Sequence, residues 1–312
     1  MIGLMKHDLE ITVDNEDDGM TARGVLHKRR GVSTRLIRGI SGGSGGIFVN
    51  GVPARFKDKV KTGDVIGLNF PEESSHFTPQ DIPVDVLFED DDIIALNKQP
   101  GIVVHPTKGH PDGTIANGLT RRMMDRGERY KIRFVNRLDM YTSGALLIGK
   151  NAHAQGHFAR QGDEKKIEKL YIAIVSGCPA RQSGEINAPI ALRSEGSPER
   201  CIREDGAPSV TRYRVIESYE MSDNMRYSLL ETRLETGRTH QIRVHLASIG
   251  CPVLGDTLYG HPAPGLICRQ ALHAVSLKFE HPVTTEPVSI FAPVPVDMAE
   301  CLDSLRDRGA VL

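Results

Sequence analysis

The segment VNRLDMYTSG, residues 135–144, precedes the apolar run ALLIG and sets an arginine and a carboxylate two residues apart. Side chains alternate along an extended backbone, so Arg137 and Asp139 would share one face, with Leu138 opposite and facing a core. Spacing alone favours a structural interpretation, in which Asp139 caps the following turn through a hydroxyl and Arg137 balances its charge. A chemical interpretation therefore needs support from elsewhere in the chain.

Strand-like stretches lie on both sides of this segment. They read VDVLFEDDDIIALNKQPGIVVHP, GALLIG, KLYIAIVSG, SVTRYRVIESY, RYSLLETRLE and LHAVSLKFEH, and helical spacing occurs in TIANGLTRRMMDRG and THQIRVHLASIG. Strands dominate, and they do not alternate regularly with helices. The sequence therefore predicts an α+β fold for residues 83–312, mostly β with flanking helices.

The N-terminal part has a different composition. Residues 23–70 hold ten basic and two acidic side chains, although the formal net charge of the whole chain is -1. Thr21 can cap a first short helix that Gly31 ends, and Ser33 can cap a second one. The stretches IFVNG and VKTGDVIGLNF then read as strands, the first with Asn-Gly turn chemistry. We interpret GGSGG, residues 42–46, as a flexible loop, because no Gly-Lys-Ser/Thr follows it as in a phosphate-binding loop.

This arrangement resembles the alpha-L RNA-binding motif of a small-subunit ribosomal protein. The matching residues are Ser33, Arg35, Leu36, Ile37, Arg38, Val49, Asn50, Gly51, Gly63 and Asp64. The resemblance implies an α/β RNA-binding module over residues 1–72, with Arg35 and Arg38 as substrate-binding residues, and a linker over residues 73–82. From charge alone, a solvated basic face is an equally good interpretation.

Composition limits the class of protein. Of the 312 residues 39% are hydrophobic and 25% are charged, which suits a folded chain with a real core. No apolar run is long enough to cross a bilayer, and the first residues lack the layout of a secretory signal, so we expect a cytoplasmic protein. The five cysteines are scattered and form no C-x-x-C pair, which predicts neither a disulfide framework nor a zinc cluster.

A second polar cluster lies in TGRTHQIRVHLASIG. It contains Arg238, His240, Gln241, Arg243 and His245. The spacing predicts an amphipathic helix with Ile242, Leu246 and Ile249 as its buried stripe. The two histidines are five apart, which turns them away from a common face, and no H-E-x-x-H occurs, so no metal site is predicted.

Taken together, these motifs resemble the RluA family of pseudouridine synthases. The resemblance rests on VNRLDMYTSGALLIGKN, KQPGIVVHPTKGHPDGTIANGL, LYIAIVSG, GEINAPIALRSEGSPERCIREDGAPSVTRYRVI, TGRTHQIRVHLASIGCPVLGDTLYG and RQALHAVSLKFEHPVT, in consistent order over residues 83–297. It implies a catalytic domain of pseudouridine synthase type that acts on RNA. Uridine isomerisation needs no redox chemistry, hydrolysis or phosphoryl transfer, so no cofactor and no metal are expected.

The resemblance also implies roles for individual residues. Asp139 would attack the target uridine, and Arg243 would pair with it; a nearby guanidinium can lower the pKa of a carboxyl by about 1–3 units. Tyr171 would lie on the extruded uracil, where stacking contributes roughly 1–3 kcal/mol. Arg137 would enter the RNA stack in place of the flipped uridine. Without the resemblance, a tyrosine packed in the core is the better interpretation of Tyr171.

The sequence departs from the family pattern at Asn136, Met140 and Tyr141, which bears on which RNA is modified. We expect a monomeric enzyme acting on ribosomal RNA, with transfer RNA as the second choice. A non-catalytic RNA-binding or ribosome-assembly factor is the alternative, yet such a protein would be expected to lose Asp139, Tyr171 or Arg243, and all three are present. A hydrolase is weaker, because no second carboxylate occupies a comparable motif.

Overall fold

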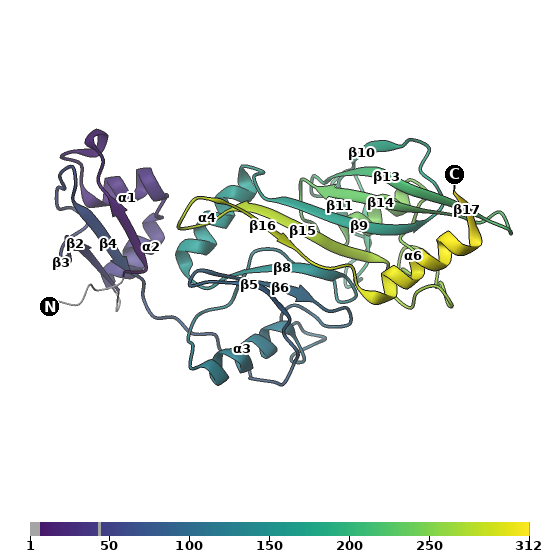
Figure 1. Cartoon of the computed structure of the whole chain (residues 1–312), viewed down its shortest axis with the longest axis horizontal. Helices are drawn as coiled ribbons and strands as arrows, with labels where there is room; N and C mark the ends of the chain where they lie inside the picture. The colour runs from purple at the N-terminus through teal and green to yellow at the C-terminus, as the bar shows by residue number, and fades with distance from the viewer. Residues whose placement is uncertain (1–6, 43–44, 312) are drawn as a thin grey trace.

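A computed structural model describes residues 7–42 and 45–311. A small N-terminal module and a larger body are joined by an extended segment, as Figure 1 shows. No helix among the described residues is both long enough and apolar enough to span a membrane.

The module packs two helices on a four-stranded antiparallel sheet. The sheet has the order β1-β4-β2-β3, with β1 Leu9–Thr12, β2 Gly46–Val49, β3 Val52–Pro53 and β4 Val65–Asn69. A 3-10 turn, η1, spans Asn15–Asp17, and the helices are α1 (Ala22–Arg30) and α2 (Thr34–Gly42). The hydroxyl of Thr21 accepts the Gly24 N–H, and Gly31 ends α1 in the left-handed region with a φ of 57°. The predicted helix pair and its caps are therefore present.

Two further features of the module are its first strand and its glycine-rich loop. Strand β1 was not predicted. Its residues alternate between buried and exposed, and it pairs with β4 in antiparallel fashion. The GGSGG loop falls partly on residues 43–44, which lie outside the described residues; Gly42 ends α2 and Gly46 begins β2. Asn50 and Gly51 have φ values of 54° and 76°, which suits the predicted hairpin turn between β2 and β3.

The larger body is built on one mixed sheet. Its main path runs β10-β13-β14-β9-β15-β8-β6-β5, with β16 beside β15, β17 beside β13 and β7 beside β8. The strands are β5 Val86–Glu89, β6 Ile93–Lys98, β7 Arg133–Phe134, β8 Ser143–Gly149, β9 Glu168–Ser176, β10 Ser183–Asn187, β13 Val210–Met221, β14 Arg226–Leu234, β15 Leu272–Glu280, β16 Pro287–Phe291 and β17 Gly309–Val311. A separate ribbon pairs β11 (Ile190–Leu192) with β12 (Arg200–Ile202). Except for β8 with β15, every strand pair is antiparallel within the described residues, which confirms the predicted α+β class.

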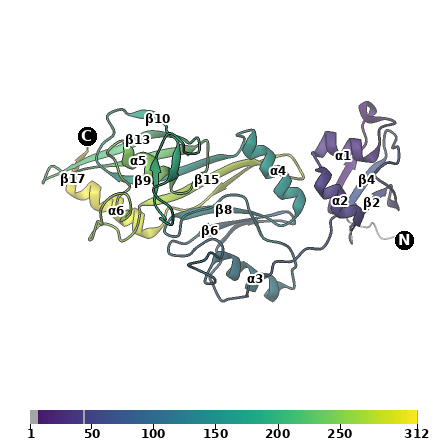
Figure 2. The same cartoon turned by 180° about the vertical axis from the view of Figure 1, so that it is seen from behind.

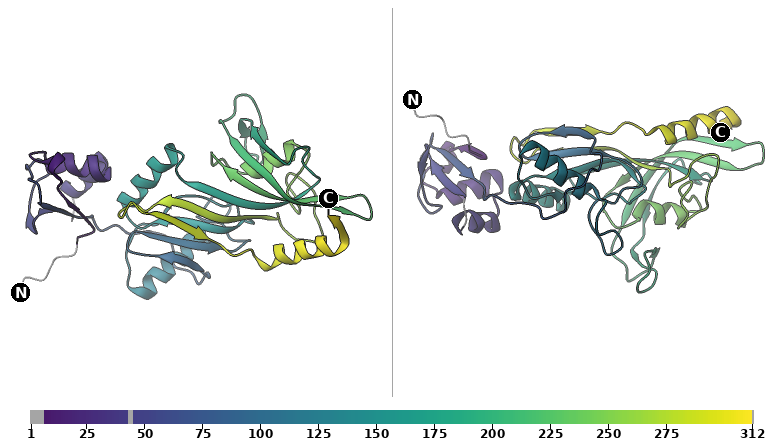
Figure 3. Two further views of the ribbon diagram at one scale, coloured as in Figure 1. Left: turned by 45° about the horizontal axis from the view of Figure 1, so that its top comes forward. Right: turned by 90° about the horizontal axis from the view of Figure 1, so that it is seen from below.

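Helices cover both faces of this sheet. They are α3 Ile115–Arg126, α4 Ala152–Asp163, α5 Gln241–Ser248 and α6 Val296–Arg308. Alternate residues of β8 enter two cores: Leu146 packs in the cluster that includes α3, α5 and α6, and Leu147 packs in the cluster that includes α4. Helix α5 lies beside β13 (Figure 2), and α6 lies at the end of the sheet away from the module (Figure 3).

The parallel pairing of β8 with β15 fixes the end of the VNRLDMYTSG segment. Ser143 is in register with His273, and Gly144 with Ala274. Gly144 has a φ of 112°, and a Cβ there would lie 2.2 Å from the carbonyl oxygen of Ala274, so only glycine allows the strands to approach this closely. The chain just before β8 is therefore held against β15.

The segment expected to be a linker has no regular secondary structure but lies along the larger body. Glu73 forms an ion pair with the buried guanidinium of Arg133. The Ser75 hydroxyl accepts the Ile132 N–H at 2.7 Å, and Asn117 donates to the Thr78 carbonyl at 2.8 Å. These contacts tie its path to the sheet.

Candidate active site

Asp139 lies in the irregular segment between β7 and β8, where the backbone that follows it binds a buried lysine. Lys98, at the end of β6, is 1% exposed, and its ammonium donates to the carbonyls of Gln99, Met140 and Thr142 at 2.8–3.0 Å. Burial lowers the pKa of Lys98 to about 7, and the Asp139 carboxylate opposes that shift. All three acceptors are satisfied only while the amine keeps its proton. Lys98 therefore fixes the backbone on the C-terminal side of Asp139.

Arg243 joins Asp139 to a second carboxylate. From the first turn of α5 its Nη1 donates to Asp139 Oδ2 at 3.0 Å, and its Nε and Nη2 donate to Asp256 at 2.6 and 2.9 Å. The bidentate contact fixes the plane of the guanidinium and leaves Nη1 for Asp139. Although burial favours the neutral acid, hydrogen bonds from Arg243 hold the pKa of Asp256 below its usual range. Burial works against the charged form of Arg243 too, but its two carboxylate partners raise its pKa.

Asp256 is itself held by the backbone. It is 1% exposed, and its Oδ1 also accepts the N–H groups of Leu258 and Tyr259 at 2.9 and 3.2 Å. The Tyr259 ring lies 5.0 Å from the guanidinium carbon of Arg243, within cation–π range. The turn after Asp256 therefore supports the arginine from two sides.

His240 occupies a strained position beside the same carboxylate. Its φ of 57° places a non-glycine residue in the left-handed region, just before α5. Its Nδ1 is 2.8 Å from the Tyr259 hydroxyl and its Nε2 is 3.9 Å from Asp139 Oδ2. Burial lowers the pKa of His240, so the ring is neutral near pH 7. It is a neutral neighbour of Asp139, not a second ion-pair partner.

The site opens into two adjoining cavities. One, of about 340 Å³, is lined by Arg137, Asp139 and Tyr171, and the other, of about 50 Å³, is lined by the same three residues and Arg243. Tyr171 on β9 is only 4% exposed, and burial raises the pKa of its hydroxyl well above the usual value. The four residues expected at the catalytic centre from the resemblance thus surround one space.

The other residues that were expected to be functional or buried lie in different parts of the structure. Arg35 and Arg38 are exposed on α2 of the module and line neither cavity. Leu138 is buried, as the alternation predicted, whereas Ile249 is 37% exposed and lies just beyond α5. The prediction of Ile249 in the buried stripe is therefore wrong, because the helix ends at Ser248, one residue before it.

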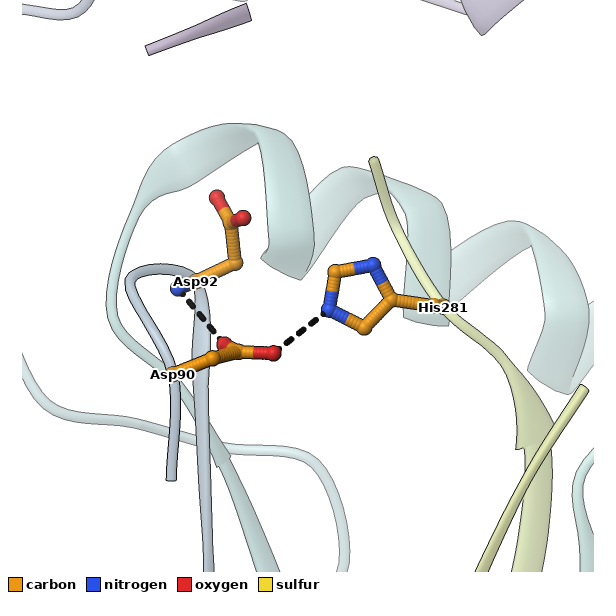
Figure 4. A group of neighbouring side chains, drawn as sticks. All are labelled: Asp90, Asp92 and His281. Carbon is orange, nitrogen blue, oxygen red and sulfur yellow. Dashed lines mark hydrogen bonds and ion pairs between the residues drawn. The ribbon is translucent and has the colours of Figure 1, made fainter. Parts of the chain in front are cut away.

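One group of three potential metal ligands occurs among the described residues, away from Asp139. It comprises Asp90, Asp92 and His281 (Figure 4). His281 Nε2 lies 2.9 Å from Asp90 Oδ2, and its Nδ1 accepts the N–H groups of Val283 and Thr284. Both ring nitrogens are engaged in the neutral ring, so the group is best described as a set of hydrogen bonds that joins two turns of the sheet and becomes an ion pair with Asp90 when His281 is protonated.

Comparison with known proteins identifies the family of the chain. The model of the RNA pseudouridylate synthase family matches residues 92–248, about half of the chain. The chain belongs to this family. An uncharacterised RNA pseudouridine synthase of Bacillus subtilis, YjbO, is 38% identical and aligns over 87% of this chain and 95% of its own. Ribosomal large subunit pseudouridine synthase D of Xanthomonas campestris is 37% identical over 86% of this synthase and 83% of that protein.

A solved structure agrees with the assignment. Human RNA pseudouridylate synthase domain containing 1 superposes with a TM-score of 0.57 at 28% identity, covering 74% of this chain and 89% of the human one. The present protein is accordingly an RNA pseudouridine synthase, an isomerase, as the sequence motifs predicted.

Two residues of the site, Asp256 and Lys98, were given no role from the sequence, and His240 was named in the polar cluster but not placed beside Asp139. Asp256 stands in VLGDTLYG, a stretch used for the resemblance without naming a role for its carboxylate. An aspartate in a turn commonly accepts the backbone N–H two residues further on, so the Gly255-Asp256 pair could have indicated a fixed carboxylate. Lys98 and His240 carry no such signal, because burial and backbone strain are not visible in residue types.

Proposed function

We propose that this synthase converts specific uridines of ribosomal RNA to pseudouridine, with Asp139 as the nucleophile. Ribosomal RNA is favoured over transfer RNA, because several relatives that align over most of this chain are named ribosomal large subunit pseudouridine synthase D. The observation that carries the proposal is the Asp139–Arg243–Asp256 array at the wall of the cavities.

The chemistry proposed for this array is the one that the family resemblance implies. The Asp139 carboxylate forms a bond with the target uridine, the N-glycosidic bond breaks, and the freed uracil turns and rejoins the ribose through carbon, which releases the carboxylate. The proton lost from that carbon is matched by a proton gained at the former glycosidic nitrogen. Atoms and electrons balance within the nucleotide, so no cofactor is required. The Arg243 guanidinium favours the ionised carboxylate in a partly desolvated site, because an opposite charge within hydrogen-bond distance stabilises it.

Arg137 and Tyr171 complete the proposed site. Arg137 is exposed and forms no hydrogen bond or ion pair with the described residues, so it is free to fill the gap that an extruded uridine leaves in the RNA. Tyr171 presents an aromatic ring to the cavity. Its raised pKa keeps the phenol neutral near pH 7, which suits contact with the uracil ring over action as a phenolate.

The N-terminal module is proposed to bind RNA. Lys28 and Arg29 are engaged with the buried carboxylate of Asp17, so they stabilise the module. Arg35 and Arg38 are exposed three residues apart on α2 and are available for phosphate groups. We propose that residues 1–72 form this module, 73–82 the connection and 83–312 the catalytic domain. The enzyme is proposed to act as a cytoplasmic monomer.

The experiment compares pseudouridine positions in ribosomal and transfer RNA from cells with and without the protein. Loss of a ribosomal position, restored by the wild-type chain, supports the proposal. Loss of a transfer-RNA position alone contradicts the preferred substrate. An unchanged pattern, together with defective ribosome assembly, would favour the non-catalytic assembly factor.

A further inference from the structure

A basic cavity adjoins the active site and is not used by the chemistry described above. It measures about 460 Å³ and is formed where the ends of β9, β14 and β15 meet the chain after α4. Its cationic lining residues are Lys165, Lys169, Arg212, Arg233 and Lys278. Two glutamates, Glu168 and Glu235, also line it, so cations predominate.

Several of these charges are already engaged. Glu235 pairs with Lys165 at 3.2 Å and with Arg212 at 2.7 Å, and Arg233 lies 3.5 Å from Glu231. The side chains of Lys169 and Lys278 have no hydrogen bond or ion pair within residues 7–42 and 45–311. Two ammonium groups without an ion-pair partner therefore line one cavity.

Lys169 connects this cavity to the active site. It lines both the 460 Å³ cavity and the 340 Å³ cavity that contains Asp139 and Tyr171. On β9 it lies two residues before Tyr171, so both side chains leave the same face of the strand about 7 Å apart. A Cβ added at Gly237 would lie 3.7 Å from its Nζ, so the ammonium rests against the turn between β14 and α5.

The environment of Lys169 indicates an anionic ligand. Burial lowers the pKa of Lys169, and no carboxylate among the described residues lies within ion-pair distance of its ammonium. A half-buried ammonium without a counter-ion is unfavourable, and a phosphate would supply the missing charge and accept its hydrogen bonds.

We propose that this basic cavity holds the RNA strand flanking the target uridine and that Lys169 binds a phosphate next to that nucleotide. The inference rests on the proposed function, because the target uridine must enter beside Tyr171. Lys278 then contacts the same strand further from the reacting nucleotide. The cavity, which we call the phosphate track, binds phosphates of this strand, and other residues recognise the base sequence.

The test measures binding of a short single-stranded oligouridylate to the full chain over a range of salt concentrations. Lys169→Gln is expected to raise the Kd roughly tenfold, as for loss of a hydrogen bond to a charged group. The slope of log K against log salt should become shallower by about 0.7, the value for one phosphate contact on a single strand. Lys169→Arg should retain most of the wild-type affinity, because it keeps the charge.

Lys131 provides the matched control, since it is an exposed lysine outside both cavities. Lys131→Gln should leave Kd and slope as in the wild type. Should Lys169→Gln fail to fold, Lys278→Gln is measured in its place and should also flatten the slope. Wild-type Kd and slope in the Gln variants would overturn the proposal, as would a lower kcat for Lys169→Gln with unchanged Kd, which would assign the ammonium to the chemistry.

The two proposals fail in distinguishable ways. If the wild-type chain forms no pseudouridine in ribosomal or transfer RNA, the proposed function is wrong, yet the salt slopes still report whether Lys169 contacts phosphate. If pseudouridine forms normally and the slopes are equal, only the phosphate track is wrong.

Discussion

Arg243 donates one hydrogen bond to Asp139, at 3.0 Å, and two to Asp256, at 2.6 and 2.9 Å. One guanidinium therefore serves two carboxylates that belong to different parts of the chain. Asp256 occupies the two donors that set the plane of the group, and the third reaches the proposed nucleophile. A lysine could supply the charge but could not make the same set of directed contacts.

The first prediction concerns Asp256. Asp256→Asn keeps the size of the side chain but removes the charge that orients Arg243. We expect kcat to fall roughly 10- to 100-fold, as for outer partners that orient the ligands of a metal. Single-turnover pseudouridine formation measures this loss, with RNA Kd measured in parallel.

A second Asp256 variant tests the burial of the pair. Asp256→Ala leaves Arg243 with Asp139 as its carboxylate partner and leaves its Nε and Nη2 donors unpaired, and breaking this buried pair should cost about 3–5 kcal/mol in the free energy of unfolding. Equal unfolding midpoints for wild type and Ala variant would contradict the geometry described here.

The second prediction concerns Lys98. Lys98→Met removes the donors to three carbonyls, two of which, from Met140 and Thr142, follow the proposed nucleophile in the chain. Each carbonyl that stays buried and unpaired costs about 1–3 kcal/mol. Urea unfolding should therefore shift to lower concentration, and turnover should fall. The exposed Lys57→Met is the control, and equal behaviour of the two variants would refute a positioning role for Lys98.

The third prediction concerns pH and the ion pair of His281 with Asp90. The hydrogen bond that His281 donates to Asp90 raises the pKa of His281, so this contribution to stability is present below about pH 6.5 and is lost as pH rises through the raised value. The pKa of Asp90 is lowered: burial opposes this, but the His281 hydrogen bond prevails. Its contribution is therefore lost at acidic pH, below about 3.9. The pair should stabilise the fold most between about pH 4 and 6.5.

Two other histidines change the stability with pH in the opposite direction. The contribution of the pair must therefore be measured as a difference in the free energy of unfolding between wild type and a variant. Burial lowers the pKa values of His153 and His157 to about 4, which makes stability rise with pH between about 4 and 6.5. The free energy of unfolding of wild type minus that of Asp90→Asn isolates the pair. This difference should shrink from pH 6 to pH 8.5, and a constant difference would show that His281 does not titrate against Asp90.

The fourth prediction concerns the module. Replacing Arg35 and Arg38 with Gln should weaken RNA binding and flatten its salt dependence by about 0.7–0.9 for each phosphate that the variant no longer binds. Arg121→Gln, an exposed arginine of α3 paired with Asp125, is the control. Identical slopes would mean that the basic face of the module is merely solvated.

Much of the fold could be predicted because its strands are apolar and its helix caps have characteristic residues. Ser143–Gly149 is buried along its whole length, and Thr21 and Gly31 bound α1 as expected. Helix α4 was missed because its buried face is partly polar. His153 and Gln161 on that face contact the carbonyls of Pro282 and Glu280, and these polar partners disguise the helical period.

The site was only partly predictable for a different reason. Residue types indicated Arg243 and Asp139 through a family pattern, but their contact depends on chain segments 104 residues apart. The backbone strain at His240 and the three carbonyl acceptors around Lys98 arise from tertiary packing. Neither leaves a periodicity or a motif that could be recognised beforehand.

The central claim is that Asp139 carries out the isomerisation. The most direct measurement quantifies pseudouridine in ribosomal RNA lacking the modification after incubation with wild type or Asp139→Asn, at equal occupancy of the RNA. We predict that the Asn variant binds this RNA with nearly wild-type affinity and forms no pseudouridine. Turnover by the Asn variant at a rate near that of the wild type would contradict the account.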